Sequence, residues 1–201
     1  MNAREEILAA VRRNRPKRRE LPDAPLFDAA LPADRVAWFR QGLERMGGVW
    51  LEPPASGDLL APAREKCTGV VVSMVPEVSG SRPIGDPRMP QALDDVDVAI
   101  VRAAFGVAET GSVCFTDAEL GTNALAYLAQ HLVVLLDPAD IVGNIHHAYQ
   151  RPELHRANYA VFHTGPSATA DIEGVLIHGA QGVRSLSVLL YPRAYRPQGH
   201  A

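Results

Sequence analysis

The sequence has few cysteines, and neither is placed for a structural bridge or a metal site. Cys67 and Cys114 are the two cysteines among 201 residues, and they belong to no Cys-x-x-Cys or Cys/His cluster. A disulfide framework, an iron–sulfur cluster and a structural zinc site all need several ligands at short spacings. We therefore expect no such group on this chain, and we expect each cysteine to be a small buried hydrophobic residue.

Long hydrophobic runs and the common nucleotide-binding motifs are also missing. Every unbroken apolar run, residues 132–136 included, is far shorter than the roughly 18 residues of a membrane-spanning helix. No apolar stretch follows the basic N-terminal residues in the manner of a secretory signal, so we expect a cytoplasmic protein without a membrane span. Walker A, Gly-x-Ser-x-Gly and Gly-x-Gly-x-x-Gly motifs are absent, which removes the main support for an ATPase, a serine hydrolase or a nicotinamide-dependent dehydrogenase.

Charge is unevenly distributed along the chain, which has a net charge of −3. Residues 1–20 are rich in Arg and Lys, whereas residues 91–140 are strongly acidic. We expect residues 1–32 to form a basic helix over 3–13 and a proline-rich connector, and residues 33–201 to form one α/β domain. The basic segment could contact nucleic acid or an acidic partner protein. The acidic body and the lack of a nucleic-acid-binding motif argue against nucleic acid.

Short runs of β-forming residues alternate with longer segments from residue 33 onward. Apolar residues at helical spacing predict a helix that ends at Gly47-Gly48, and a crossover helix is expected over 139–149. Strands are expected over 49–52, 69–74, 96–101, 112–116, 131–136, 159–163 and 185–191. Several of these runs are apolar throughout, which suits strands covered on both faces. The sequence therefore predicts an α/β fold with a mainly parallel sheet flanked by helices.

Two segments could carry chemistry, and the first follows the strand expected over 159–163. It continues through Gly165, Ser167, Thr169 and Asp171, at the kind of strand end where α/β sheets bind ligands. Ser167 or Thr169 could cap a following helix, or the backbone N–H groups beside them could hold a small anionic ligand. Spacing alone favours the capping interpretation.

The second segment is a tight turn at Glu109, Thr110 and Gly111. A partly desolvated carboxylate in such a turn can act as a general base or as a nucleophile toward an activated acyl group. The alternative is a solvent-exposed turn residue without a chemical role. His163 and His178 are weaker binding candidates near the first segment. The seven histidines show no metal-binding spacing, so no metal site is expected.

Together these motifs resemble the LUD-domain family. The resemblance rests on Ala108-Glu109-Thr110-Gly111-Ser112, on the Gly-Pro-Ser-Ala-Thr-Ala-Asp-Ile-Glu string over 165–173, and on residues 176–182 and 186–190. It implies a fold similar to that of the ribose-5-phosphate isomerase and CoA-transferase superfamily. It also implies a role in oxidising L-lactate to pyruvate with iron–sulfur partner subunits, this chain being the subunit that carries no cluster or other cofactor.

The resemblance also assigns roles to the candidate residues. Glu109 is the expected catalytic carboxylate, because its turn is similar to the glutamate-bearing turn of class I CoA transferases, a likeness at the level of the fold. The expected ligand-binding residues are Thr110, Gly111, Gly165, Ser167, Thr169, Asp171 and His178.

The chain departs from the family pattern in two places. Residues 122–130 replace a usual Arg-x-x-Ser-Leu-Leu-Pro stretch, and residues 181–183 replace a usual His-Gly-Pro turn. A cationic anchor for a substrate carboxylate is therefore missing from its expected place. Two other functions stay open: an acyl- or CoA-transfer enzyme that uses Glu109, and a non-catalytic assembly protein that docks an acidic partner through its basic helix.

Overall fold

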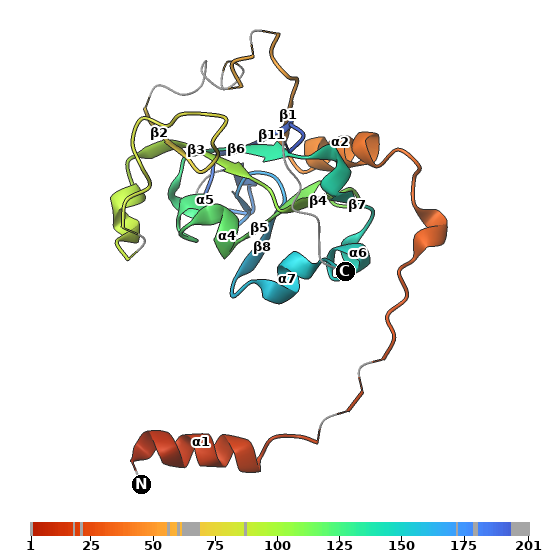
Figure 1. Cartoon of the computed structure of the whole chain (residues 1–201), viewed down its shortest axis with the longest axis vertical. Coiled ribbons are helices and arrows are strands. Elements are labelled where there is room, and N and C mark those ends of the chain that lie inside the picture. Colours follow the sequence, from red (N-terminus) through yellow and green to blue (C-terminus); the bar gives the residue numbers. More distant parts are fainter. Residues whose placement is uncertain are drawn as a thin grey trace.

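The computed structural model describes residues 2–17, 19–20, 22–55, 57–59, 61, 69–86, 88–171, 173–178 and 181–193. These residues form a parallel sheet, a smaller second sheet, a two-stranded hairpin and short helices (Figure 1). No helix within these ranges is long and apolar enough to cross a membrane. Cys67 lies outside them, whereas Cys114 is fully buried, as the sequence predicts for it.

Two helices precede the first strand, both where the sequence predicts them. α1 (Ala3–Arg13) begins at a capping box, in which the Asn2 and Glu5 side chains each accept a hydrogen bond from the other residue's backbone N–H. No residue of α1 is buried, and Figure 1 shows it at the end of an extended segment, apart from the sheets. α2 (Arg35–Arg45) is capped by the Asp34 side chain and packs an apolar stripe against the core.

The central sheet has the strand order β1-β11-β6-β3-β2, and every neighbouring pair is parallel. Its strands are β1 (Val49–Leu51), β2 (Val70–Ser73), β3 (Val96–Arg102), β6 (His131–Leu136) and β11 (Ser185–Leu190). Along β6, Leu132 and Val134 belong to one buried cluster, and Val133 and Leu135 belong to a second cluster on the other face. Both faces are covered, which explains the uninterrupted apolar runs. The predicted α/β class with a mainly parallel sheet is confirmed.

A second sheet, of order β7-β4-β5-β8, lies beside the first and is mostly antiparallel. β4 (Phe105–Val107) pairs in parallel with β7 (Ile141–Val142), whereas β5 (Ser112–Thr116) pairs antiparallel with both β4 and β8 (Ala160–His163). The short helices are α4 (Asp117–Leu120), α5 (Leu125–Leu128), α6 (Ile145–Ala148) and α7 (Pro152–Arg156), with 3-10 turns η1 (Asp28–Ala30), η2 (Pro90–Leu93) and η3 (Pro138–Asp140).

The crossover helix expected over 139–149 is wrong. The segment instead contains the end of η3, the short strand β7 and the single-turn helix α6. The β-branched pair Ile141-Val142 pairs with β4, and the buried Gly143 follows it just before α6. Tertiary packing therefore overrides the helical tendency of this stretch.

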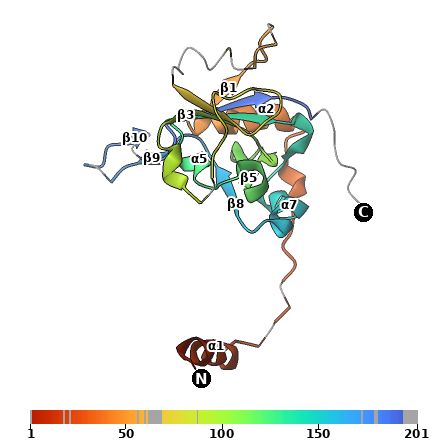
Figure 2. The ribbon, with the colours of Figure 1, turned by 60° about the vertical axis from the view of Figure 1, so that its left-hand side comes forward.

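The helix expected after Ser167 and Thr169 is also wrong. Residues Ala168–Thr169 form β9, which pairs antiparallel with β10 (Ile177–His178) in a hairpin that projects from the body (Figure 2). The Thr169 hydroxyl accepts a hydrogen bond from the Asp171 backbone and donates one to the Asp171 carboxylate, so it closes a local turn. Positive φ angles at Glu173 and Gly174 then reverse the chain.

Candidate functional site

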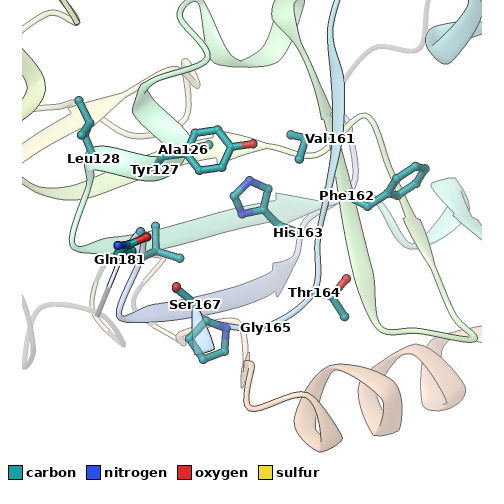
Figure 3. A pocket seen from close by; sticks show the side chains of 13 residues that line it. Ala126, Tyr127, Leu128, Val161, Phe162, His163, Thr164, Gly165, Ser167 and Gln181 are labelled. Carbon is teal, nitrogen blue, oxygen red and sulfur yellow. The ribbon is translucent and has the colours of Figure 1, made fainter. Parts of the chain in front are cut away.

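A pocket of about 600 Å³ opens at the carboxyl end of β8. It is enclosed by α5, by the turn that follows β8 and by the segment that enters β11 (Figure 3). The lining residues are Ala126, Tyr127, Leu128, Val161, Phe162, His163, Thr164, Gly165, Pro166, Ser167, Gln181, Gly182 and Val183. β8 belongs to the second sheet, so this pocket is not the carboxyl-end crevice of a parallel sheet that the sequence suggested.

Gly165 shapes the pocket by letting the turn after β8 pack against the end of α2. Its φ is +77°, and a Cβ at this position would lie 2.1 Å from the Met46 carbonyl oxygen. Only glycine fits such a position without moving the backbone. The next residues are held by the Ser167 N–H, which donates to the Val183 carbonyl at 3.0 Å. The turn is therefore fixed from both sides.

His163 is the central polar side chain of the pocket. Its ring packs on Phe115 and Tyr127, with centroid separations of 5.4 and 5.3 Å. In Figure 3 the imidazole points between the Tyr127 ring and the side of the pocket lined by Ser167 and Gln181. The buried Nε2 atom has no hydrogen-bond partner in the described part of the chain. Burial lowers the pKa of His163, because charging the ring would cost its hydration, so the ring is neutral at pH 7.

Tyr127 forms the opposite wall of the pocket and is also uncharged. Its hydroxyl shares a hydrogen bond with the Tyr159 hydroxyl. Partial burial, together with this hydrogen bond, raises the pKa of Tyr127 to about 12. The phenol therefore stays protonated near neutral pH and presents a ring face and a hydroxyl group.

The Glu109 turn lies next to the pocket without lining it. The carboxylate is exposed, and its Oε2 accepts a hydrogen bond from the Ile145 N–H, at the start of α6, at 3.2 Å. It makes no ion pair within the described residues. Gly111 locks the turn onto α2, because a Cβ there would lie 2.0 Å from the Leu43 nitrogen. The carboxylate is therefore exposed to solvent and not partly desolvated as expected, and one backbone N–H holds it.

Three hydroxyl groups join the Glu109 turn to the pocket. Thr110 Oγ1 lies 2.7 Å from Ser112 Oγ, which lies 2.5 Å from Thr164 Oγ1 on the pocket wall. The two segments singled out in the sequence therefore meet in space, through strands β5 and β8 of the second sheet.

The structure divides the predicted ligand-binding residues into three groups. Gly165 and Ser167 line the pocket, and Thr110 and Gly111 belong to the neighbouring turn. Thr169 and Asp171 lie in the projecting hairpin, bonded to each other, and neither lines the pocket. His178 pairs through its backbone with Ala168 in that hairpin, and its side chain lies outside the described part of the structure.

Sequence reasoning missed Tyr127 and Gln181 and gave His163 little weight. A signal was present, because the two departures from the family pattern, 122–130 and 181–183, supply Tyr127 and Gln181 to the same pocket. No Arg, Lys, Asp or Glu is among the pocket residues that the structure describes.

Comparison with known proteins places the chain in a family. A family model, the LUD domain, matches residues 84–191, which is more than half of the chain. The chain belongs to the LUD domain family. Every pocket residue and the whole Glu109 turn lie inside the matched LUD domain.

The fold of this LUD domain is similar to a solved structure. A crystal structure of a DUF162 family protein from Deinococcus radiodurans matches with a TM-score of 0.59 and 15% sequence identity. The match covers 79% of this chain and 96% of the other. At this identity the likeness concerns the fold alone. No curated protein matches the sequence.

Proposed function

We propose that this LUD-domain chain is a cytoplasmic subunit or accessory protein of an L-lactate utilization system, corresponding to the family's lactate utilization protein C. In that system L-lactate is oxidised to pyruvate, and iron–sulfur partner subunits accept the electrons. The supporting observation is that the matched LUD domain contains both the Glu109 turn and the adjoining pocket as one connected site.

The chemistry assigned to this chain is proton handling and ligand positioning. Glu109 is exposed and held by a single backbone N–H, so it can take a proton from a substrate hydroxyl that reaches the turn. Thr110, in the same turn, can contact that substrate, and the buried Ser112 hydroxyl links Thr110 to Thr164. We assign electron transfer to the partner subunits. Burial raises the pKa of Cys114 to about 12, so this thiol stays protonated near neutral pH.

The first test is growth on L-lactate. A strain that lacks the gene for this chain should fail to grow with L-lactate as the carbon source and should recover when the gene is returned. A tagged chain purified from lactate-grown cells should bring down iron-containing subunits, measured by iron analysis and visible absorption. Normal growth of the deletion strain on L-lactate would contradict the proposed role in L-lactate utilization.

Glu109→Gln tests the role of the carboxylate. The variant keeps the size of the side chain and the hydrogen bond from the Ile145 N–H but cannot take up a proton. We therefore expect the growth rate on L-lactate to fall at least tenfold. Glu173→Gln is the matched control, because Glu173 is exposed in the projecting hairpin. Full activity of Glu109→Gln, with normal thermal stability, would exclude Glu109 from the chemistry.

An acyl- or CoA-transfer enzyme is the second candidate, favoured by the exposed carboxylate of Glu109, whose Oε1 carries no hydrogen bond within the described residues. Such an enzyme would attack the thioester carbonyl of an acyl-CoA with this oxygen, which breaks the C–S bond, expels CoA as its thiolate and leaves the acyl group on Glu109 as a mixed anhydride. Attack of the thiolate on the glutamyl carbonyl would then release the acyl group as a carboxylate and leave CoA on Glu109 as a thioester. Incubation with acetyl-CoA, followed by mass spectrometry of the intact chain, should then show an adduct that Glu109→Gln does not form. Absence of any adduct favours the lactate role.

A further inference from the structure

We propose that the pocket beside β8 binds an uncharged, planar heteroaromatic ring, such as a nucleobase or the isoalloxazine of a flavin, and not a carboxylate or phosphate. The inference concerns the pocket itself and does not depend on the lactate proposal. It rests on the charge of the lining, on which hydrogen-bonding groups remain free, and on the shape of the walls.

The lining offers no opposite charge to an ionic ligand. None of the described pocket residues is Arg, Lys, Asp or Glu, and the two titratable side chains, His163 and Tyr127, are neutral at pH 7. A buried anion without a cationic or multiple N–H partner loses hydration that nothing replaces. The pocket therefore selects against charged molecules.

The donors expected to hold an anion are already engaged. The Ser167 N–H donates to Val183, the Asp171 N–H donates to Thr169, and the Thr164 hydroxyl is shared with Ser112. Within the described structure, the Ser167 hydroxyl and the Gln181 amide make no hydrogen bond, and the Nε2 atom of His163 has no partner but is buried behind the pocket surface. The hydroxyl and the amide supply neutral donors and acceptors to the pocket, as the edge of a heteroaromatic ring requires.

The remaining walls suit a flat and largely apolar body. Tyr127, Leu128, Val161, Pro166 and Val183 present ring faces and aliphatic surface to the pocket. Aromatic side chains stack on any base or ring with a π face. A sugar would leave most of its hydroxyls unpaired here, and a hydrocarbon would cover the Ser167 hydroxyl and the Gln181 amide without bonding to them.

The pocket is larger than a three-carbon acid needs. Its volume of about 600 Å³ lies in the range of roughly 300–1,000 Å³ that accommodates drug-sized ligands. A lactate or pyruvate molecule would leave most of this space to water. A bicyclic or tricyclic ring occupies more of it and can lie against both Tyr127 and Gln181, which line the pocket.

The test is direct binding to the purified full-length chain. Adenosine and riboflavin are the probes, because they carry the two rings without a phosphate group. We expect one of them to bind with a Kd below about 1 mM by calorimetry, with L-lactate and inorganic phosphate at tenfold excess failing to displace it. The probe that binds identifies the ring.

Gln181→Arg should weaken ring binding at least tenfold, because it replaces a neutral amide at the pocket with a cation that the ring must desolvate. Gln91→Arg makes the same exchange at an exposed residue of η2 outside the pocket and should leave binding unchanged.

Two outcomes would overturn the proposal. One is that neither ring binds to the folded chain below about 1 mM. The other is that lactate or phosphate binds and Gln181→Arg tightens that binding without affecting a ring. Both are read on the isolated chain without partner subunits, so they are separate from failure of the growth test on L-lactate.

Discussion

Gly165 is the residue on which the pocket depends most directly. A Cβ at this position would lie 2.1 Å from the Met46 carbonyl oxygen, and φ is +77°. Gly165→Ala should therefore lower the free energy of unfolding by about 3 kcal/mol or more, since steric displacement adds to the 1–2 kcal/mol cost of the left-handed conformation. Urea unfolding followed by circular dichroism measures the loss.

Gly174→Ala is the matched control for Gly165→Ala. Gly174 has a similar φ of +71°, but a Cβ there would meet no atom within 4 Å. This variant should cost only the conformational part, about 1 kcal/mol. Equal losses of unfolding free energy in the two variants would mean that overlap of the added Cβ with the Met46 carbonyl oxygen costs nothing.

His163 should make stability depend on pH in a known direction. Burial lowers its pKa below the value of about 6.5 found in unfolded chains. Above pH 6.5 both states are neutral, whereas below it the unfolded state takes up a proton that the folded state resists. The free energy of unfolding should therefore fall as the pH drops from about 6.5 toward the folded-state pKa.

His163→Phe isolates this contribution from the other histidines. Phenylalanine keeps a ring beside Phe115 and Tyr127 and removes a buried nitrogen that has no partner. The variant should be at least as stable as the wild type at pH 8 and should lose less stability between pH 7 and pH 5. Identical pH profiles would show that His163 does not resist protonation in the folded state.

The helices and strands that local sequence signals determine are predicted well from the sequence. The Asn2 and Glu5 capping box marks the start of α1, and Gly47 marks the end of α2. β6 and β11 are apolar enough to be read directly as buried strands. The helix prediction for residues 139–149 fails because Ile141-Val142 pairs with β4, a strand distant in the sequence. The helix prediction after Thr169 fails because Ala168–Thr169 instead pairs with β10 in a local hairpin.

α1 is the element whose removal should matter least to the fold. None of its residues is buried, and Ile7 and Val11 are 63% and 61% exposed on its apolar face. Deletion of residues 1–20 should change the free energy of unfolding by no more than about 0.5 kcal/mol, as expected for exposed positions. The same chain should lose co-purification with its partners if the basic helix docks them. A large loss of stability would contradict the exposed placement of α1.

For the whole molecule, the sequence could predict that the Glu109 turn and the Gly165 turn belong to one site. It could not predict which residues form the other walls of the pocket. The Glu109 turn and the Gly165 turn meet because β5 and β8 pair, and the hydroxyls of Ser112 and Thr164 then touch. The opposite wall comes from α5 and from residues 181–183, which are distant in the chain. Strand order decides that proximity, and no local pattern encodes it.

The two sheets are held together where the chain leaves the parallel sheet. Arg193, three residues beyond β11, donates to the carbonyl of Ala103, between β3 and β4, at 2.9 Å. Its Nε donates to Asp140 Oδ2, just before β7, at 3.2 Å, and its backbone N–H donates to Asp137. One partly buried guanidinium thus joins the end of the parallel sheet to two strands of the second sheet.

Arg193→Met should therefore destabilise the whole molecule. The substitution keeps an aliphatic stem but leaves the Ala103 carbonyl and one Asp140 oxygen without this donor, at a cost of about 1–3 kcal/mol. Arg184→Met, at an exposed arginine for which the described residues show no side-chain bond, should change the free energy of unfolding by less than about 0.5 kcal/mol. Because one hydrophobic core contains residues of both sheets, such as Leu132 of β6 and Phe115 of β5, thermal unfolding of Arg193→Met should stay a single transition at a lower midpoint. Two separate transitions in calorimetry would show that the sheets fold as independent units.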